Sequence, residues 1–189
     1  MIKKILFIYF ILLPLNSFAL IEVDITRGNL NPLPVAVSPL SIDENSRLSF
    51  KKILKRENIG SEISLIVENN LRISGLFNPL SKDAFLQSPD IANLKPRFED
   101  WNLIKAQALI TGKVSYIDDK LRVEFRLWDV LAAKEMMALA FTTVPTNWRR
   151  VGHIISDKVY QRLTGEQGYF DTRIIYVAEE GPKTQRIKK

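Results

Sequence analysis

The chain has 189 residues, 46% apolar and 25% charged, enough for one domain of ordinary size with a hydrophobic core. It contains no cysteine, which excludes disulfides, thiol catalysis, cysteine-ligated zinc and lipid attachment at a mature N-terminal cysteine. The formal charge is mildly basic at +6, and part of the surplus lies in the C-terminal KTQRIKK. A short basic tail is ordinarily solvated, so charge alone does not indicate a nucleic-acid or lipid partner.

Residues 1–19 have the pattern of a secretory signal peptide. Lys3 and Lys4 form a positive start, an apolar run extends from Ile5 to Leu15, and Ser17-Phe18-Ala19 is a small-x-small cleavage site. The apolar run is too short to cross a bilayer, which takes about 20 residues. We expect cleavage after Ala19 and export to a periplasm, with no stable membrane insertion of the mature chain; an uncleaved anchor is the alternative.

The mature chain begins with two strand patterns. The stretch LIEVDITRGN alternates apolar and polar residues and ends at Gly28-Asn29, and PVAVSPL from Pro34 is a second short strand. The next residues, 41–58, are charged and irregular, and we expect a loop there.

A helical pattern follows Asn58, which is a suitable N-cap, and Gly75 suits its C-terminal end. Its apolar face comprises Ile59, Ile63, Ile66, Val67 and Leu71. The stretch FNPLSKDAFLQSPD is expected to be a loop. A short helix then begins near Pro96, with Phe98, Trp101 and Ile104 three residues apart.

Three consecutive strands are predicted next. ALITGKVSYI is followed by a turn at Asp118-Asp119 and by KLRVEFRLWDV, in which Leu121 starts a strict alternation of apolar and polar residues. KEMMALAFTTV is the third strand. A helix from Asn147 to Gly165 carries one apolar stripe: Trp148, Val151, Ile154, Ile155, Val159 and Leu163. This order predicts an α/β domain, a mixed β-sheet with two main helices packed on it.

No catalytic or metal-binding constellation emerges from the sequence. His153 is the single histidine and lies mid-helix beside the apolar stripe, where a boundary position is more common than a catalytic one. There is no histidine cluster, no G-x-S-x-G and no G-x-x-x-x-G-K. The adjacent acidic pairs have the placement of turn and surface charges, and we predict no enzyme, no cofactor and no metal.

Tryptophan provides a possible nucleic-acid platform, because Trp101, Trp128 and Trp148 could stack on bases. Two of the three lie on the apolar stripes of predicted helices. Export from the cytoplasm would also separate the chain from nucleic acids, so we predict no nucleic-acid partner.

The N-terminal strand pattern leaves two interpretations open. It could pair within the sheet of its own domain, or it could add to the edge of another protein's sheet. The pattern alone favours pairing within its own domain.

Much longer stretches resemble the TolB family, periplasmic components of the Tol-Pal envelope system, in their alphaproteobacterial form. These stretches are VDITRGN, PLPVAV, NNLRISGLFNPL, IKAQALITGKV, LRVEFRLWDV, NWRRVGHIISDKVYQRLTGEQGYFDTRIIYVAE and GPKTQRIKK. Together they cover nearly the whole mature chain. Residues 41–58 match weakly.

The resemblance implies a domain organisation. A TolA-binding segment would occupy residues 20–33, an α/β domain similar to an anticodon-binding domain residues 34–168, and a remnant of the first strand of a β-propeller residues 169–189. In the family the propeller engages the lipoprotein Pal, so Pal binding is expected to be lost from this chain.

The resemblance also implies a function: a non-enzymatic, monomeric module that binds the C-terminal domain of TolA and supports outer-membrane integrity and constriction at cell division. The TolA-binding residues would be Ile21, Glu22, Val23, Asp24, Ile25, Thr26, Arg27 and Gly28. One alternative is a truncated gene fragment that folds without an independent role. Another is single-stranded nucleic-acid binding by the anticodon-domain-like fold, an analogy of fold alone.

Overall fold

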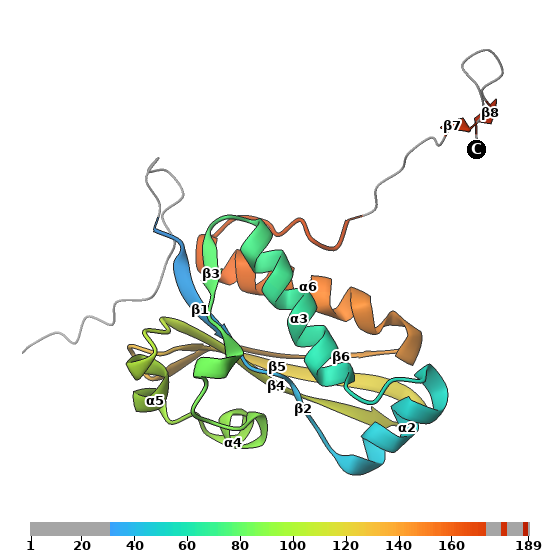
Figure 1. The fold of residues 1–189 in the computed structure, drawn as a ribbon, viewed down its shortest axis with the longest axis horizontal. Helices are drawn as coiled ribbons and strands as arrows, with labels where there is room; N and C mark the ends of the chain where they lie inside the picture. Colours follow the sequence, from blue (N-terminus) through green and yellow to red (C-terminus); the bar gives the residue numbers. More distant parts are fainter. Residues whose placement is uncertain (1–30, 173–178, 181–186, 189) are drawn as a thin grey trace, which may run out of the picture.

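A computed structural model describes residues 31–172, 179–180 and 187–188 (Figure 1). Its helices and strands are β1 (Leu33–Val37), β2 (Ser41–Ile42), α2 (Glu44–Leu54), α3 (Ile59–Ile73), β3 (Phe77–Pro79), η1 (Lys82–Ala84), α4 (Pro89–Leu94), α5 (Phe98–Leu103), β4 (Ala108–Ile117), β5 (Lys120–Asp129), β6 (Lys134–Thr143), η2 (Pro145–Asn147), α6 (Trp148–Thr164), β7 (Glu179–Glu180) and β8 (Ile187–Lys188). The predicted signal peptide lies outside the described residues.

The main sheet is mixed, as the sequence predicted. Its strand order is β3-β1-β4-β5-β6, and β2 pairs with β4 beyond the end of β1. Strands β3, β1, β2 and β4 run parallel, whereas β4, β5 and β6 form an antiparallel meander. The two long helices α3 and α6 lie side by side on one face, and the short helices α4 and α5 lie on the other (Figure 1). The predicted fold class is therefore confirmed.

Strand β5 shows why the register of the meander is fixed. Its alternating apolar residues from Leu121 to Leu127 are buried in the core beneath α3 and α6, while the residues between them are partly exposed. A slip by one residue would exchange the two faces, which burial of these side chains opposes. The preceding hairpin turn is Asp118-Asp119, as predicted, and both residues have positive φ, 50° and 59°, typical of a tight two-residue turn.

Helices α3 and α6 follow their predicted apolar stripes and pack closely. A Cβ at Gly152 of α6 would lie only 2.9 Å from a methyl carbon of Ile66 on α3, so the missing side chain permits this approach. Gly165 adopts a φ of +77° at the end of α6, as a C-terminal glycine does. Asn58 and Asn147 occupy the N-cap positions, but neither makes a side-chain capping bond. Asn147 donates to Thr143 Oγ1 instead.

The loop predicted for residues 41–58 is wrong. This stretch contains β2 and the 11-residue helix α2, whose N-cap is Asp43. The only buried residues of α2 are Ser46 and Phe50, because the helix lies at the end of the sheet and exposes most of its surface. A helix with so narrow a buried face gives almost no apolar periodicity in the sequence.

The loop predicted from Phe77 to Asp90 is also wrong, since it contains β3, η1 and the start of α4. Strand β3 has three residues and exists through its parallel pairing with β1, in which Leu33 lies opposite Phe77. Such a short strand is specified by its distant partner rather than by its own pattern. Helix α4 begins with Pro89, which is tolerated at the first position of a helix.

A serine on α3 joins the helix to a break between β1 and β2. The chain pairs with β4 through β1 and again through β2, and residues 38–40 between them belong to neither strand. Ser64 Oγ accepts a hydrogen bond from the Leu40 amide at 3.0 Å, and its single proton is shared between the Ser38 carbonyl at 3.0 Å and the Gly60 carbonyl at 3.1 Å. One buried hydroxyl thus satisfies two backbone groups of the break.

Replacing this serine should destabilise the fold far more than replacing a neighbouring one. In Ser64→Ala the buried Leu40 amide loses its acceptor, which costs about 1 to 3 kcal/mol. Ser61→Ala, on the exposed side of the same helix, should change the free energy of unfolding by less than about 0.5 kcal/mol. Urea unfolding followed by circular dichroism measures both, and equal losses in the two variants would contradict the bridging role of Ser64.

Helix α2 should weaken in acid because of its N-cap. The Ser46 amide donates to Asp43 Oδ1 at 2.9 Å, and this bond is the main cause that holds the pKa of Asp43 below its ordinary value. A carboxyl whose pKa is lower in the folded state stabilises the fold above its unfolded pKa, and this contribution is lost as the pH falls through the folded pKa. Between about pH 4 and pH 2 the chain should therefore lose more stability than Asp43→Asn, which retains a capping oxygen without a charge. Urea unfolding across this pH range checks the difference, and parallel pH profiles would refute it.

Candidate functional site

The predicted TolA-binding residues, Ile21 to Gly28, lie outside the described residues. The structure shows instead where this segment is attached. The chain enters β1 at Leu33, whose amide donates to the Leu76 carbonyl at 2.9 Å. Strand β1 has β3 on one side and β4 on the other (Figure 1). Both edges of β1 are therefore occupied, and no further strand can pair beside it.

The two edges of the main sheet differ in how they are protected. Strand β3 is three residues long and ends in Pro79, and shortness and proline both discourage pairing with a foreign strand. Strand β6, at the other edge, is ten residues long and pairs only with β5 among the described residues. Its pairing with β5 shifts register at Met136, an irregularity that protects this end of the edge, and from Met137 to Thr143 the strand contains neither a charge nor a proline.

A hollow of about 200 Å³ lies between the end of β6 and the first turns of α6. It is lined by Phe141, Thr142, Thr143, Asn147, Arg150, Val151 and Ile154. Close by, Leu139 on β6 and Val144 after it are 37% and 53% exposed. An uncharged strand edge thus borders a partly apolar hollow.

The opposite face of the same strands carries a second shallow hollow, of about 210 Å³, over Ala138 and Ala140. The charges at its rim are paired. Arg122 Nε donates to Glu124 at 2.7 Å, and Arg126 Nε lies 3.4 Å from Glu135. This hollow therefore offers no unbalanced charge to a ligand.

His153 occupies the boundary position that the sequence predicted, partly buried between α6 and α3. Its Nδ1 lies 2.9 Å from the Asn70 side-chain nitrogen, which also donates to Ser156 Oγ at 2.9 Å. Ser156 Oγ in turn donates to the Gly152 carbonyl. These contacts join two helices through polar groups, and no carboxylate takes part in them.

The acidic pairs serve local structure. Asp43 caps α2, Asp100 accepts from Arg97 and Gln87, and Asp119 accepts from the Tyr116 hydroxyl at 2.8 Å. The last of these bonds raises the pKa of Tyr116. Among the described residues, no group of three or more histidine and acidic side chains is placed to hold a metal ion.

The three tryptophans do not form one stacking surface. Trp101 lies on α5, is buried in a cluster with Ala92 of α4 and Leu109 of β4, and donates to Gln87. Trp128 donates to Thr111 Oγ1, and Trp148 is 5% exposed, with two arginines over its ring. Trp101 and Trp148 are thus buried, and Trp128 is partly exposed.

Sequence reasoning found strand β6 but not its position at the sheet edge. Strand order is set by pairings between distant residues, so a local pattern does not report it. The sequence contained one signal for this edge position. The stretch MALAFTT has no charged residue, and the helix that follows it carries cations several residues apart. In the part of the chain that the structure describes, no helix has the length and hydropathy needed to cross a membrane.

Comparisons with known proteins agree with this fold. Residues 21–136 match the TolB amino-terminal domain family. All 189 residues align with the Tol-Pal system protein TolB of Pelagibacter ubique strain HTCC1062 at 80% identity, and the chain spans 42% of that protein's length. The crystal structure of TolB from Acinetobacter baumannii is similar with a TM-score of 0.62 over 84% of this chain and 35% of that one, at 24% identity. Because the family match covers more than half of its residues, the chain belongs to the TolB amino-terminal domain family.

Proposed function

We propose that the chain is a non-enzymatic interaction module of the Tol-Pal cell-envelope system, which acts in the periplasm and binds TolA through Ile21 to Gly28. The observation that carries the proposal is the family match, which begins at Ile21 and so includes this segment in the shared domain. The relative at 80% identity is itself described as a Tol-Pal system protein.

Strand addition is the mode of binding that the segment suits. Ile21, Val23 and Ile25 alternate with polar residues, so one face of an extended segment would be apolar. Backbone amides and carbonyls would provide the affinity, and the alternate side chains would set the register. Strand β1 supports this mode, because both of its edges are taken and it offers no place for the segment that precedes it.

The biological role follows from the system. A module that couples TolA to the envelope would support outer-membrane integrity and constriction during division. Since the chain spans only 42% of the relative's length, Pal binding is not proposed for these residues.

Removing Leu20 to Asn31 should abolish measurable binding to the purified TolA C-terminal domain in a calorimetric titration. A sharper variant is Val23→Pro, which removes a backbone donor and should weaken binding at least about tenfold. Val23→Thr preserves the donor and the β-branched shape, and should bind within about threefold of the unmodified chain.

Unchanged far-UV circular dichroism confirms that each variant keeps its fold. If the deletion variant bound TolA as tightly as the full chain, the assignment of the segment would be wrong.

A further inference from the structure

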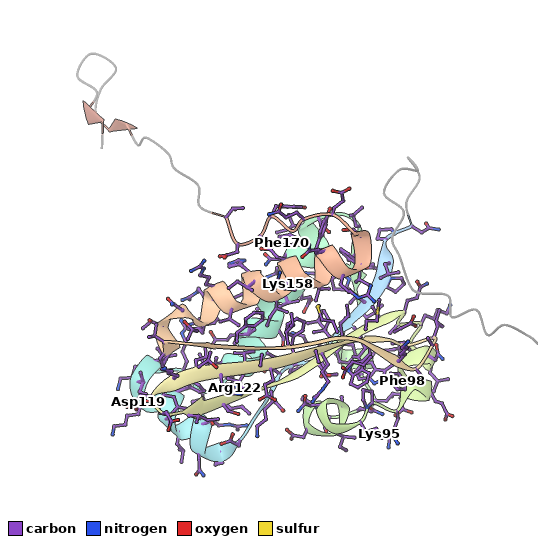
Figure 2. The ribbon with its side chains drawn as sticks, turned by 180° about the vertical axis from the view of Figure 1, so that it is seen from behind. Lys95, Phe98, Asp119, Arg122, Lys158 and Phe170 are labelled. Atoms are coloured by element: carbon purple, nitrogen blue, oxygen red, sulfur yellow. The ribbon has the colours of Figure 1, made fainter. Side chains whose placement is uncertain are left out.

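The edge of β6 lies against a stripe of α6 side chains that borders it along its length. Arg150, Ile154, Lys158 and Arg162 are spaced by four residues, which places them on one side of the helix. Contacts at both ends show that this side faces β6. Arg150 and Ile154 line the hollow with Phe141, and Arg162 Nε donates to the Met136 carbonyl at 3.3 Å. Figure 2 shows Lys158 on α6 between these ends.

Among the described residues, the charges along this stripe are balanced at one end only. Arg150 is paired with Asp171, with its Nε 3.1 Å from both carboxylate oxygens. Asp157 accepts hydrogen bonds from the amides of Phe170 and Asp171, so it too serves the segment after α6. Arg162 donates to a carbonyl rather than to a carboxylate, and Lys158 is exposed.

The edge of β6 and this stripe of α6 together border a groove, and its two ends differ. Near Thr142 it is a partly apolar hollow, near Met136 it is bordered by Arg162, and the exposed Lys158 lies on the helix between Ile154 and Arg162. Six residues of extended chain separate Thr142 from Met136, a length of about 20 Å.

We propose that β6 accepts an extended acidic segment of a second protein by strand addition. The added strand would place an apolar side chain in the hollow and carboxylates beside Lys158 and Arg162. Only every second residue of the added strand would face α6. Its apolar residue and its acidic residues would therefore lie on that same face, four to six positions apart in its sequence. This site is separate from the TolA-binding segment and goes beyond the proposed function.

A second copy of the chain does not suit this groove. Antiparallel pairing of two β6 strands about a twofold axis would bring the Met136 end of one copy to the Thr142 end of the other. Arg162 of one copy would then approach the Arg150–Asp171 pair of the other, whose charges balance, so a second copy brings no unpaired carboxylate to the cations of the groove.

The chain's own N-terminal segment fits poorly as well. Its Ile21, Val23 and Ile25 share one face of a strand, and Glu22 and Asp24 share the other. The groove requires an apolar and an acidic side chain on the same face, so neither face of this segment matches both ends.

Two labelled eight-residue peptides test the proposal on the full chain by fluorescence polarisation. Both carry threonine on one face and, on the other, an isoleucine followed by three glutamates or by three lysines at alternate positions. The glutamate peptide should bind at least about tenfold more tightly at low salt, and the preference should shrink as salt is added.

Charge reversal at Lys158, compared with the same reversal at a distant lysine, tests whether this cation contacts the peptide. Lys158→Glu should weaken binding of the glutamate peptide about fivefold or more and strengthen binding of the lysine peptide. Lys52→Glu makes the same charge change at an exposed position on α2 and should leave both affinities within about twofold. Equal effects of the two variants, or equal binding of the two peptides, would overturn the proposal.

Hydrogen exchange shows whether the contact is a strand. The glutamate peptide should slow amide exchange in Lys134–Thr143 and leave Ala108–Ile117, inside the sheet, unchanged. The variant lacking Leu20 to Asn31 should respond in the same way, which separates this site from TolA binding. If β6 were protected from exchange in the free chain and lost this protection in the deletion variant, the occupant would be the N-terminal segment. If the protection rose with protein concentration, the occupant would be a second copy. Either result would overturn the proposal.

Discussion

The close contact of Leu40 with α3 and β4 determines how the two halves of the domain fit together. A Cβ at Gly60 of α3 would collide with the Leu40 carbonyl oxygen, and a Cβ at Gly112 of β4 would lie 2.8 Å from a Leu40 methyl carbon. Two glycines therefore leave room for one leucine. Ser64 binds the backbone on both sides of the same break, and Ser41 Oγ donates to the Gly112 carbonyl just beyond it. The helix, the parallel strands and the meander meet at this point.

This contact has consequences for the sheet edges. Because β1 and β2 both pair along one side of β4, the meander of β5 and β6 grows only from the other side. The parallel half ends in the short strand β3, and the antiparallel half ends in the long strand β6. The surface suited to strand addition therefore lies at the far end of the sheet from β3, beside α6, and the packing around Leu40 is one of the constraints that place it there.

The elements that the sequence predicted correctly are those whose signal is local. Strand β5 alternates strictly, and α3 and α6 each carry a full apolar stripe, so their side chains alone indicate their conformation. Helix α2 buries little more than Phe50, and β3 depends on pairing with Leu33, some forty residues away in the chain. The edge position of β6 depends on the order of all the strands. Local periodicity contains none of this information. The order of the predicted elements indicated the mixed α/β class, and the family resemblance added the likeness to an anticodon-binding domain.

Both proposed contacts rely on backbone hydrogen bonds, which do not by themselves discriminate between partners. A chain whose sequence contains a strand-forming segment and whose sheet has an open edge is at risk of pairing with itself. Side-chain placement provides the discrimination. The N-terminal segment separates its apolar and acidic residues onto opposite faces, while the β6 groove places an apolar hollow and two cations above a single face. A strand that satisfies the groove must mix the two kinds of residue on one face, and a strand with Ile21, Val23 and Ile25 on one face leaves Lys158 and Arg162 without a carboxylate. Specificity at this edge would therefore come from the pattern of the added strand rather than from its propensity to be a strand.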